Sequence, residues 1–243
     1  MEFKDKKVVI TGGVRGIGRE IAEEFKKRGA HIAVIDKENN DLEWEVFYKG
    51  DISEEETLVK FSDIVLKEFE KIDYLINNAC LSKKGLLSNC SFEDFNYVLK
   101  VGVIAPYILT KLFLNQFNPN AAVVNISSTR ALMSQPDTES YSAAKGGISA
   151  LTHAMAISLS GKVRVNSISP GWINTSGKYE NFSKSDHKQH PVKRIGKVCD
   201  ISNIALFLCS EKSSFINGEN ITVDGGISKL MIYHDEFGWK YEE

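Results

Sequence analysis

The stretch KKVVITGGVRGIG at residues 6–18 decides the fold. Its β-branched residues at 7–11 predict a strand, and the residues from Gly16 to Arg28 predict a helix. The glycines between them allow a tight turn and let a ligand approach the backbone closely. Because a helix N-terminus attracts anions, this unit predicts a nucleotide-phosphate site. The residues expected to contact the nucleotide here are Gly12, Arg15, Gly16, Ile17 and Gly18.

The rest of the chain alternates short β-branched runs with longer helical stretches. Strands are expected at 7–11, 31–35, 46–49, 73–76, 121–126, 163–168 and 220–223, and helices at 16–28, 54–70, 92–117, 139–160 and 201–209. This alternation predicts a single doubly wound, Rossmann-like α/β domain over residues 1–243, with a mostly parallel seven-stranded sheet and helices on both faces. Residues 37–45 are too few for a usual crossover helix, so one face of this sheet edge should be thinly covered.

The bulk composition is that of an ordinary globular protein. The 243 residues are 42% hydrophobic and 26% charged, which is enough for one large domain. The formal net charge of -2 argues against a nucleic-acid partner, and no apolar run reaches membrane-spanning length. The start of the chain carries no secretory signal, and the cysteines show neither a CxxC pair nor metal-ligand spacing. We therefore expect a cytoplasmic protein without a bound metal, with reduced thiols at Cys80, Cys90, Cys199 and Cys209.

Three residues form a candidate catalytic group. Tyr141 and Lys145 stand in a Tyr-x-x-x-Lys pair, which places a phenol and an ammonium one helical turn apart on one face. A neighbouring ammonium favours the phenolate, so the phenol exchanges its proton more readily. Ser128, thirteen residues before Tyr141, offers a hydroxyl that orients a carbonyl. Together with a hydride carrier, these are the parts of a carbonyl reductase or an alcohol dehydrogenase.

Asp36 ends the second expected strand. In a dinucleotide-binding unit, an acid near this distance from the glycine turn binds the ribose 2′-hydroxyl. The alternative is an aspartate that only closes the strand at the surface. Because the glycine turn is present, the ribose interpretation is favoured.

The combined motifs resemble those of the short-chain dehydrogenase/reductase family, whose common form is close to this chain in length. The resemblance extends from Lys6 to Gly226. It rests on TGGVRGIG at 11–18, Asp51 after the third strand, NNA at 77–79, NISS at 125–128, YSAAK at 141–145, PGWINT at 170–175 and VDGG at 223–226. A glycine turn alone is weak evidence of a family, but this combination is specific.

The resemblance implies a role for each matching position. Tyr141 is expected to be the general acid in reduction and the base in oxidation. Lys145 is expected to hold the nicotinamide ribose, and Ser128 to bind the substrate oxygen. Asn78 and Asp51 are expected to line the adenine side of the cofactor. The remaining expected cofactor contacts are Ile173 and Thr175 at the carboxamide, and Ile52, Ala79, Pro170 and Gly171.

The expected activity is hydride transfer between a nicotinamide cofactor and a small-molecule secondary alcohol or ketone. Two alternatives stay open. One is a cofactor-binding or sensing protein with weak or lost catalysis. The other is an NADP-dependent 3-oxoacyl carrier reductase.

Two residues have opposite implications for the choice of cofactor. In the family, a basic residue at the position of Arg15 often accompanies a 2′-phosphate. The carboxylate of Asp36 would instead repel that phosphate. We give Asp36 the greater weight, because it occupies the ribose position directly, and we predict NAD in preference to NADP.

Two positions depart from the family pattern. Gly102 stands where the family usually carries an asparagine that anchors a proton-relaying water, and Cys80 replaces the glycine of an NNAG motif. Either a water bonded to the backbone fills the vacated volume, or the enzyme is slowed by the roughly 100- to 10,000-fold that acid–base catalysis supplies. Cys80 is expected to be a small buried filler, with a redox-sensitive thiol as the alternative.

Two further segments have an unusual composition. The loop 176–194 and Arg130 place basic residues beside the expected substrate site, against Glu180 and Asp186. Either the substrate is anionic or this loop is a solvated, mobile segment. The extension 227–243 is too aromatic for a frayed tail, so we expect it to pack on its own subunit or on a neighbour. Its aromatic residues are Tyr233, Phe237, Trp239 and Tyr241.

The last expectation concerns assembly. The helix expected over 139–160 carries a stripe of small residues about 200° around from Tyr141. The stripe consists of Ala143, Gly147, Ala150 and Ala154. Such a stripe lets another helix approach closely, either within the chain or from a second copy. In the family this helix usually forms a subunit interface, so the resemblance implies a homodimer or homotetramer, with the homotetramer preferred.

Overall fold

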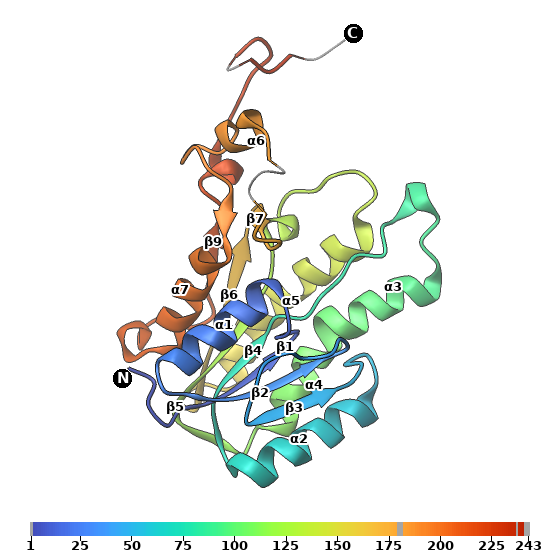
Figure 1. Cartoon of the computed structure of the whole chain (residues 1–243). Helices are drawn as coiled ribbons and strands as arrows, with labels where there is room; N and C mark the ends of the chain where they lie inside the picture. The colour runs from blue at the N-terminus through green and yellow to red at the C-terminus, as the bar shows by residue number, and fades with distance from the viewer. Residues whose placement is uncertain (1, 179–181, 237, 241–243) are drawn as a thin grey trace.

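Seven parallel strands form the central sheet (Figure 1). The computed structural model describes residues 2–178, 182–236 and 238–240, and the sheet order is β3-β2-β1-β4-β5-β6-β9. The strands are β1 Lys7–Thr11, β2 His31–Asp36, β3 Val46–Lys49, β4 Ile72–Asn77, β5 Phe117–Ile126, β6 Val163–Pro170 and β9 Asn220–Val223. Every neighbouring pair is parallel. The predicted Rossmann-like fold with a seven-stranded sheet is confirmed.

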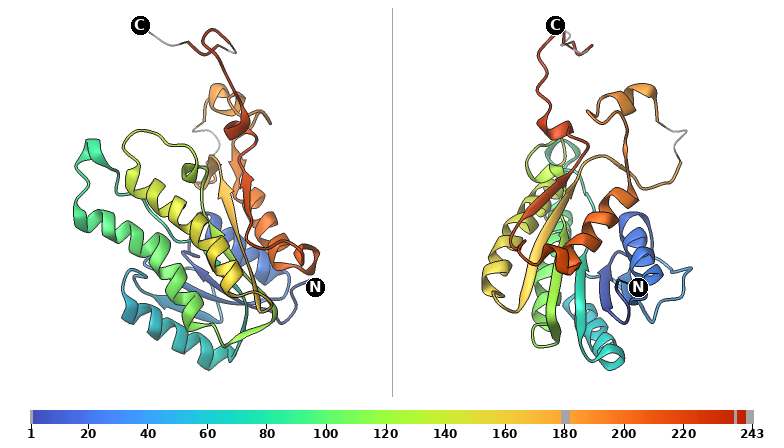
Figure 2. Two further views of the ribbon diagram at one scale, coloured as in Figure 1. Left: turned by 180° about the vertical axis from the view of Figure 1, so that it is seen from behind. Right: turned by 90° about the vertical axis from the view of Figure 1, so that its left-hand side faces the viewer.

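Helices cover both faces of this sheet (Figure 2). One face carries α1 (Gly16–Lys27) and α7 (Val198–Cys209), which pack on each other. The other face carries α2 (Glu55–Phe69), α4 (Ala105–Leu112) and α5 (Glu139–Ser158). Among the described residues, none of these helices has the length and apolar character of a membrane span.

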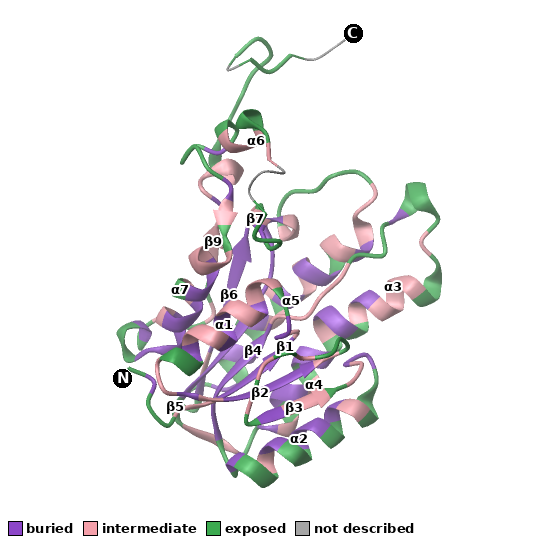
Figure 3. Ribbon diagram, in the orientation of Figure 1, coloured by how far each residue is buried: buried purple, intermediate pink, exposed green. Residues whose placement is uncertain are grey.

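The core consists of two apolar layers, one on each side of the sheet (Figure 3). Side chains alternate along each strand, so Val9 packs with the α2 side and Val8 and Ile10 pack with the α1 side. All three are fully buried. Burial on both faces explains why the strands read as continuous apolar runs rather than as alternating patterns.

The predicted single helix over 92–117 is wrong, because this segment divides into three helical pieces and the start of a strand. The pieces are α3 (Phe92–Leu99), a π-helical segment at Lys100–Ile104 and α4. Phe117 then begins β5 and pairs with Ile72. The pattern did not show this early start, because residues 117–120 include a proline and two asparagines, which strands disfavour.

The π-helical segment interrupts the regular helix around Gly102. The backbone N–H of Ala105 donates to the carbonyl of Lys100, five residues back. Pro106 has no N–H and therefore cannot form the ordinary helical bond to the Gly102 carbonyl. π-helical turns often accompany functional sites, and this one packs beside α5.

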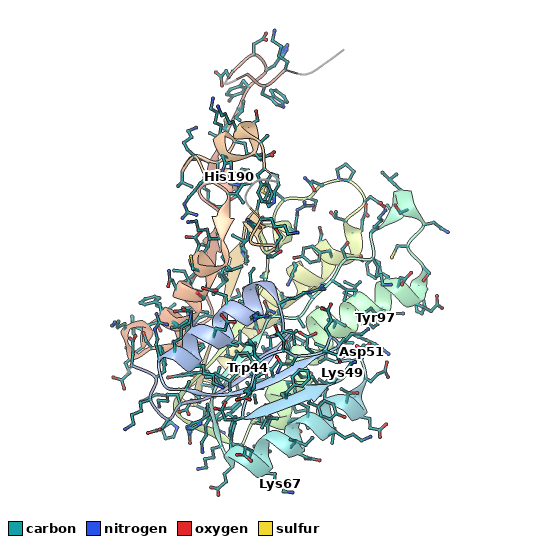
Figure 4. The ribbon with its side chains drawn as sticks, viewed as in Figure 1. Trp44, Lys49, Asp51, Lys67, Tyr97 and His190 are labelled. Atoms are coloured by element: carbon teal, nitrogen blue, oxygen red, sulfur yellow. The ribbon has the colours of Figure 1, made fainter. Side chains whose placement is uncertain are left out.

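The connection between β2 and β3 is short and non-helical, as predicted. Residues 37–45, all of which are described, form no helix. Trp44 (Figure 4) covers part of this edge, with its ring centre 5.2 Å from the Nζ of Lys26 on α1. Its indole N–H donates to Asn40 Oδ1 at 3.1 Å. A tryptophan thus shields the face that a crossover helix usually covers.

A small parallel strand pair and a short helix were not predicted. β7 (Ile173–Asn174) pairs with β8 (Gly196–Lys197), and α6 (Lys184–Lys188) lies between them in sequence. Ser183 begins α6 with a capping box, which stabilises the first turn of so short a helix. This region includes the loop 176–194, which is expected to place basic residues beside the substrate site and whose Glu180 lies outside the described residues.

The C-terminal extension leaves the body of the molecule (Figure 1). Its residues 229–236 and 238–240 are exposed, and Tyr233 and Trp239 retain 65% and 43% of their accessible surface. For these residues, the expectation of packing on the same subunit is wrong, and packing on a neighbour stays a prediction. Phe237 and Tyr241 lie outside the described residues.

Candidate active site

Two adjoining cavities lie at the carboxyl edge of the sheet. The strand order reverses between β1 and β4, which is where doubly wound sheets bind ligands. The first, called the glycine-turn cavity here, has a volume of about 410 Å³. The second, called the tyrosine cavity, has a volume of about 740 Å³. The residues that line both are Ile17, Asn78, Cys80 and Thr175.

The glycine turn has the backbone geometry that its sequence predicts. Gly12 and Gly16 adopt φ angles of +68° and +58°, which side chains disfavour. A Cβ on Gly18 would lie 2.1 Å from the carbonyl oxygen of Gly12, so only glycine fits there. α1 begins at Gly16 without a side-chain cap, so its first N–H groups remain available to an anion. The turn therefore fits a nucleotide phosphate.

Asn78 and Thr11 fasten this turn to the end of β4. The Thr11 hydroxyl accepts the N–H groups of Asn78 and Ala79, both at 3.1 Å. The Asn78 amide donates to the carbonyls of Thr11 and Gly12 at 3.1 and 2.8 Å. Asn78 thus lies at the junction of the two cavities, whereas Asp51 lines the glycine-turn cavity alone. Of the two residues expected at the adenine side, Asp51 therefore lies within the glycine-turn cavity and Asn78 lies between the two cavities.

Among the described residues, five charged side chains line the glycine-turn cavity, and four of them are paired. Arg15 pairs with Glu38 at 2.9 Å, and Lys37 pairs with Asp51 at 2.8 Å. The fifth, Asp36, has no ion-pair partner in the described part of the chain, and its carboxylate accepts two backbone N–H groups at 3.1 Å each. The charge left unbalanced in this cavity is therefore negative.

Asp51 and Tyr97 lie close together (Figure 4), and Lys37 joins them. The Tyr97 hydroxyl donates to Asp51 at 3.0 Å, and the Lys37 ammonium lies 2.6 Å from that hydroxyl. Partial burial raises the pKa of Asp51, but hydrogen bonds from Lys37, Ser53 and Tyr97 outweigh it, and the net shift is downward. The hydrogen bond to Asp51 raises the pKa of Lys37. Both groups are therefore charged at neutral pH.

The tyrosine cavity brings together the three residues predicted to be catalytic. Ser128, Tyr141 and Lys145 all line it. The Lys145 Nζ lies 5.4 Å from the centre of the Tyr141 ring. Ser128 follows the carboxyl end of β5, and α5 supplies the other two residues. A phenol, an ammonium and an aliphatic hydroxyl thus share one cavity next to the glycine turn.

The hydrogen bonds of these residues leave donors for a ligand. Lys145 is 3% exposed, and its ammonium donates to the carbonyl of Ile126 at 2.6 Å. This bond uses one of its three hydrogens. The Ser128 oxygen accepts the N–H of Arg130 at 3.1 Å, which leaves the hydroxyl hydrogen available to another acceptor.

Buried hydrogen bonds hold α5 against β5. The Ser127 hydroxyl donates to the Lys145 carbonyl at 2.9 Å. Asn77 donates to Asn125 at 2.8 Å, and Asn125 donates to Thr152 at 2.9 Å. Thr152 is 1% exposed and anchors the helix from within the core. These hydrogen bonds fix α5 against the sheet and so fix the position of the tyrosine–lysine pair.

Cys80 and Gly102 are neighbours beside α5. A Cβ on Gly102 would lie 2.9 Å from the Ala144 Cβ and 3.1 Å from the Cys80 Sγ. The thiol and Ala144 therefore crowd the place where a side chain at position 102 would begin. Cys80 is half-buried and lines both cavities, so the expectation of a small buried filler is wrong. The side chain of residue 80 thus packs against the position where residue 102 has none.

The other predicted cofactor residues surround the same cavities. The glycine-turn cavity is lined by Gly12, Arg15, Gly16, Ile17, Asp36, Ile52 and Ala79. The tyrosine cavity is lined by Pro170, Gly171, Ile173 and Thr175. Gly18 does not line either cavity, but its missing side chain permits the close packing of the turn.

Sequence reasoning missed several lining residues. Lys37 directly follows Asp36 in the sequence, and this position next to a predicted site residue could have identified it. Tyr97 had none, because it reaches the cavity from α3, which is distant in the chain. The tyrosine cavity also receives side chains from the loops that follow β5 and β6 and from the end of α6. These are Met133, Ser134, Gln135, Thr138, Trp172 and Gln189.

Comparisons with known proteins agree with this fold. A family model described as enoyl-(acyl carrier protein) reductase matches residues 12–228. An uncharacterized oxidoreductase from Thermotoga maritima is 36% identical over 96% of this chain and 100% of its own. The structure of an apo SCOR enzyme from Clostridium thermocellum is 42% identical, with a TM-score of 0.92 over 98% of this chain and 99% of that one. A glucose/ribitol dehydrogenase of the short-chain dehydrogenase/reductase type from Brucella melitensis is 29% identical, with a TM-score of 0.85 over 95% and 99%.

These matches cover nearly the whole of each chain rather than a nucleotide-binding half alone. They therefore extend over both cavities and over α5. This chain belongs to the short-chain dehydrogenase/reductase family of oxidoreductases.

Proposed function

We propose that this chain is an alcohol dehydrogenase or ketone reductase that acts on secondary alcohols or ketones and uses NAD in preference to NADP. Members of its family use one of these two nucleotides. The observation that carries the proposal is the meeting of Ser128, Tyr141 and Lys145 in a cavity that adjoins the glycine turn. A proton donor and a hydroxyl that orients a carbonyl thus lie beside a site for a hydride carrier.

The lining residues fit a nicotinamide dinucleotide. The close turn at Gly12 and Gly18 and the uncapped start of α1 suit its pyrophosphate. The Asp36 carboxylate would accept hydrogen bonds from the adenosine ribose, and the remaining Lys145 donors would hold the nicotinamide ribose. The bound cofactor supplies or accepts the hydride.

In reduction, the substrate carbonyl oxygen accepts hydrogen bonds from Ser128 and Tyr141. As the carbonyl carbon gains the hydride, the C=O π bond breaks and its electron pair moves to oxygen. That oxygen takes the phenolic proton of Tyr141, which yields the alcohol. The Lys145 ammonium stabilises the phenolate left behind. In oxidation the same phenolate accepts the proton of the alcohol.

A spectrophotometric screen tests this proposal. NADH and NADPH are offered with a panel of ketones, and NAD and NADP with the matching alcohols. The competing candidate is a cofactor-binding or sensing protein, for which Gly102 is the motivating observation. Hydride transfer with any member of the panel supports the enzyme. A chain that binds NADH tightly but oxidises it with no ketone would be the binding protein instead.

Cofactor choice gives the first prediction. The unpaired Asp36 carboxylate should repel a 2′-phosphate, so NADH is expected to bind more tightly than NADPH. Asp36→Asn keeps an oxygen acceptor but removes the charge. It should reduce the ratio of the NADPH and NADH dissociation constants by about tenfold, or about 1.4 kcal/mol. Fluorescence titration gives both dissociation constants. Asp63→Asn, on the exposed face of α2, is the matched control. Equal or tighter binding of NADPH by the unmodified chain would contradict the choice of NAD.

We also propose that the enzyme is a homo-oligomer, with a homotetramer preferred over a homodimer. Ala143, Ala150 and Ala154 of the small-residue stripe are exposed on α5, so no helix of the same chain covers them. Gly147 is half-buried against Val103. A second copy is therefore the partner that the stripe would accept.

Ala150→Glu is expected to dissociate the oligomer, because it would bury an unpaired charge against the partner helix. Light scattering at micromolar concentration measures the mass. Lys67→Glu, on α2, introduces the same residue away from α5 and should leave the mass unchanged. A monomer mass for the unmodified chain would refute the assembly.

We place the enzyme in the cytoplasm. Cys80, Cys90, Cys199 and Cys209 are all described and all free thiols. Free thiols fit a reducing compartment.

A further inference from the structure

The tyrosine cavity carries positive charge. Among the described residues that line it, the charged ones are Arg130 and Lys145, and neither Asp nor Glu contributes. The mechanism above uses Lys145 for the cofactor ribose and the phenolate. It gives no task to Arg130, although this residue lies two positions from Ser128. A cation is thus left over in the cavity that would receive the substrate.

Arg130 has no ionic partner within the described part of the chain. Its Nη2 donates to the side-chain oxygen of Gln135, but its buried Nη1 has no hydrogen-bond partner among the described residues. Arg19 and Arg194, in contrast, contact carboxylates: Arg19 lies 2.9 Å from Glu23, and Arg194 lies 2.6 Å from Asp200. A buried charged donor without an acceptor is costly. A hydrogen-bond acceptor on a bound ligand would satisfy the Arg130 Nη1.

The backbone ties Arg130 to the reacting end of the cavity. It belongs to the short 3₁₀ turn Thr129–Ala131 that follows β5, and its N–H donates to the Ser128 Oγ at 3.1 Å. Ser128 is proposed to hold the reacting oxygen, and both residues line this cavity, so one molecule bound there can contact both side chains. Uncharged polar side chains complete this part of the cavity: Ser134, Gln135, Thr138 and Gln189.

We propose that the substrate carries a carboxylate and that Arg130 binds it, so that the substrate is a small hydroxy acid or keto acid. This inference rests on the proposed function and narrows its substrate class. A guanidinium matches a carboxylate in shape, and it stays charged throughout the physiological pH range. One guanidinium, with one nitrogen already bonded to Gln135, balances a monoanion better than the dianion of a phosphate ester. The surrounding hydroxyl and amide groups suit further hydroxyls on the substrate.

The test compares pairs of compounds that differ in charge but hardly in shape. The pairs are acetoacetate with acetoacetamide, lactate with lactamide, and gluconate with gluconamide. Calorimetry measures binding to the full chain saturated with NADH for the keto compound and with NAD for the hydroxy compounds, and turnover is followed in parallel. In at least one pair the carboxylate is expected to be favoured by at least about tenfold. If no carboxylate outperforms its amide, including the case in which none binds, the assignment is wrong.

Variants at Arg130 identify the residue responsible. Arg130→Met should abolish the preference while leaving binding of the amide nearly unchanged, and Arg130→Lys should restore part of it. Lys67→Met removes a cation from the exposed side of α2 (Figure 4) and should preserve the preference for the carboxylate. Thermal melting confirms that each variant folds. An equal loss of carboxylate and amide in Arg130→Met would mean that Arg130 shapes the cavity without binding the anion.

Two further arms separate the other outcomes. A preference limited to dihydroxyacetone phosphate over dihydroxyacetone would overturn the carboxylate in favour of a phosphate. Failure of the proposed function has its own signature: carboxylate binding that depends on Arg130, without hydride transfer, keeps the anion site and rejects the reaction. Hydride transfer to neutral ketones that is indifferent to Arg130 keeps the reaction and rejects the anion site.

Discussion

Tyr141→Phe is expected to lower turnover by at least about 100-fold while NADH binding stays nearly unchanged. The substitution keeps the aromatic ring on α5 and removes the proton that, in the proposed mechanism, the substrate oxygen receives. A 100-fold loss corresponds to about 2.7 kcal/mol of transition-state stabilisation. Turnover is measured with an active ketone from the screen, and the dissociation constant of NADH by fluorescence titration.

The control is Tyr74→Phe, which makes the same chemical change inside the core. Tyr74 is 6% exposed on β4 and lines neither the glycine-turn cavity nor the tyrosine cavity. Its variant should turn over substrate normally. If Tyr141→Phe is equally active, Tyr141 is not the proton donor. If it loses NADH affinity in proportion to turnover, its role is structural.

Gly102→Asn is expected to destabilise the protein and to lower its activity. The added Cβ alone would approach the Ala144 Cβ to 2.9 Å and the Cys80 Sγ to 3.1 Å. Ala144 is fully buried and lies between Tyr141 and Lys145 in the sequence of α5, so relief of this contact would shift the proposed catalytic pair. Overpacking of this kind typically costs about 1–3 kcal/mol. Chemical denaturation measures the loss of stability, and NADH oxidation measures the loss of activity.

A double-mutant cycle tests whether Cys80 and Gly102 compensate for each other. Cys80→Gly removes the thiol that occupies the space, so the double variant should recover stability that Gly102→Asn alone has lost. The expected coupling is about 0.5–3 kcal/mol. Simple additivity of the two effects would show that the positions are independent. If the double variant turns over faster than the unmodified enzyme, the combination of Cys80 and Gly102 slows this enzyme.

Most of the fold could be predicted because each strand carries a strong local signal. β1, β2, β3 and β9 begin within a residue of their predicted positions, since apolar runs bounded by turn residues define them. The segment 92–117 was misread for a physical reason. Helical periodicity continues through the π-helical turn, and the first residues of β5 include Pro119, which resembles a loop. Of these residues, Phe117 pairs with Ile72 on β4, and a register shift follows before the pairing resumes at Ala122.

The candidate site was predictable where its residues lie in compact motifs. The glycine turn, Asp36 and the tyrosine–lysine pair are local patterns, and the fold brings them to one edge of the sheet. Contacts between distant segments could not be predicted. Tyr97 reaches Asp51 across the sheet edge, and Cys80 fills the space beside Gly102. Such packing depends on the relative placement of helices, which periodicity does not specify.

Deuterium transfer tests the central claim most directly. The enzyme is incubated with NADH deuterated at the transferable position of the nicotinamide and with an active ketone or keto acid. Mass spectrometry then locates the label in the product alcohol. We predict one deuterium on the carbinol carbon with the unmodified chain, and about 100-fold slower labelling with Tyr141→Phe. Tight NADH binding without deuterium in any product across the panel would contradict the account.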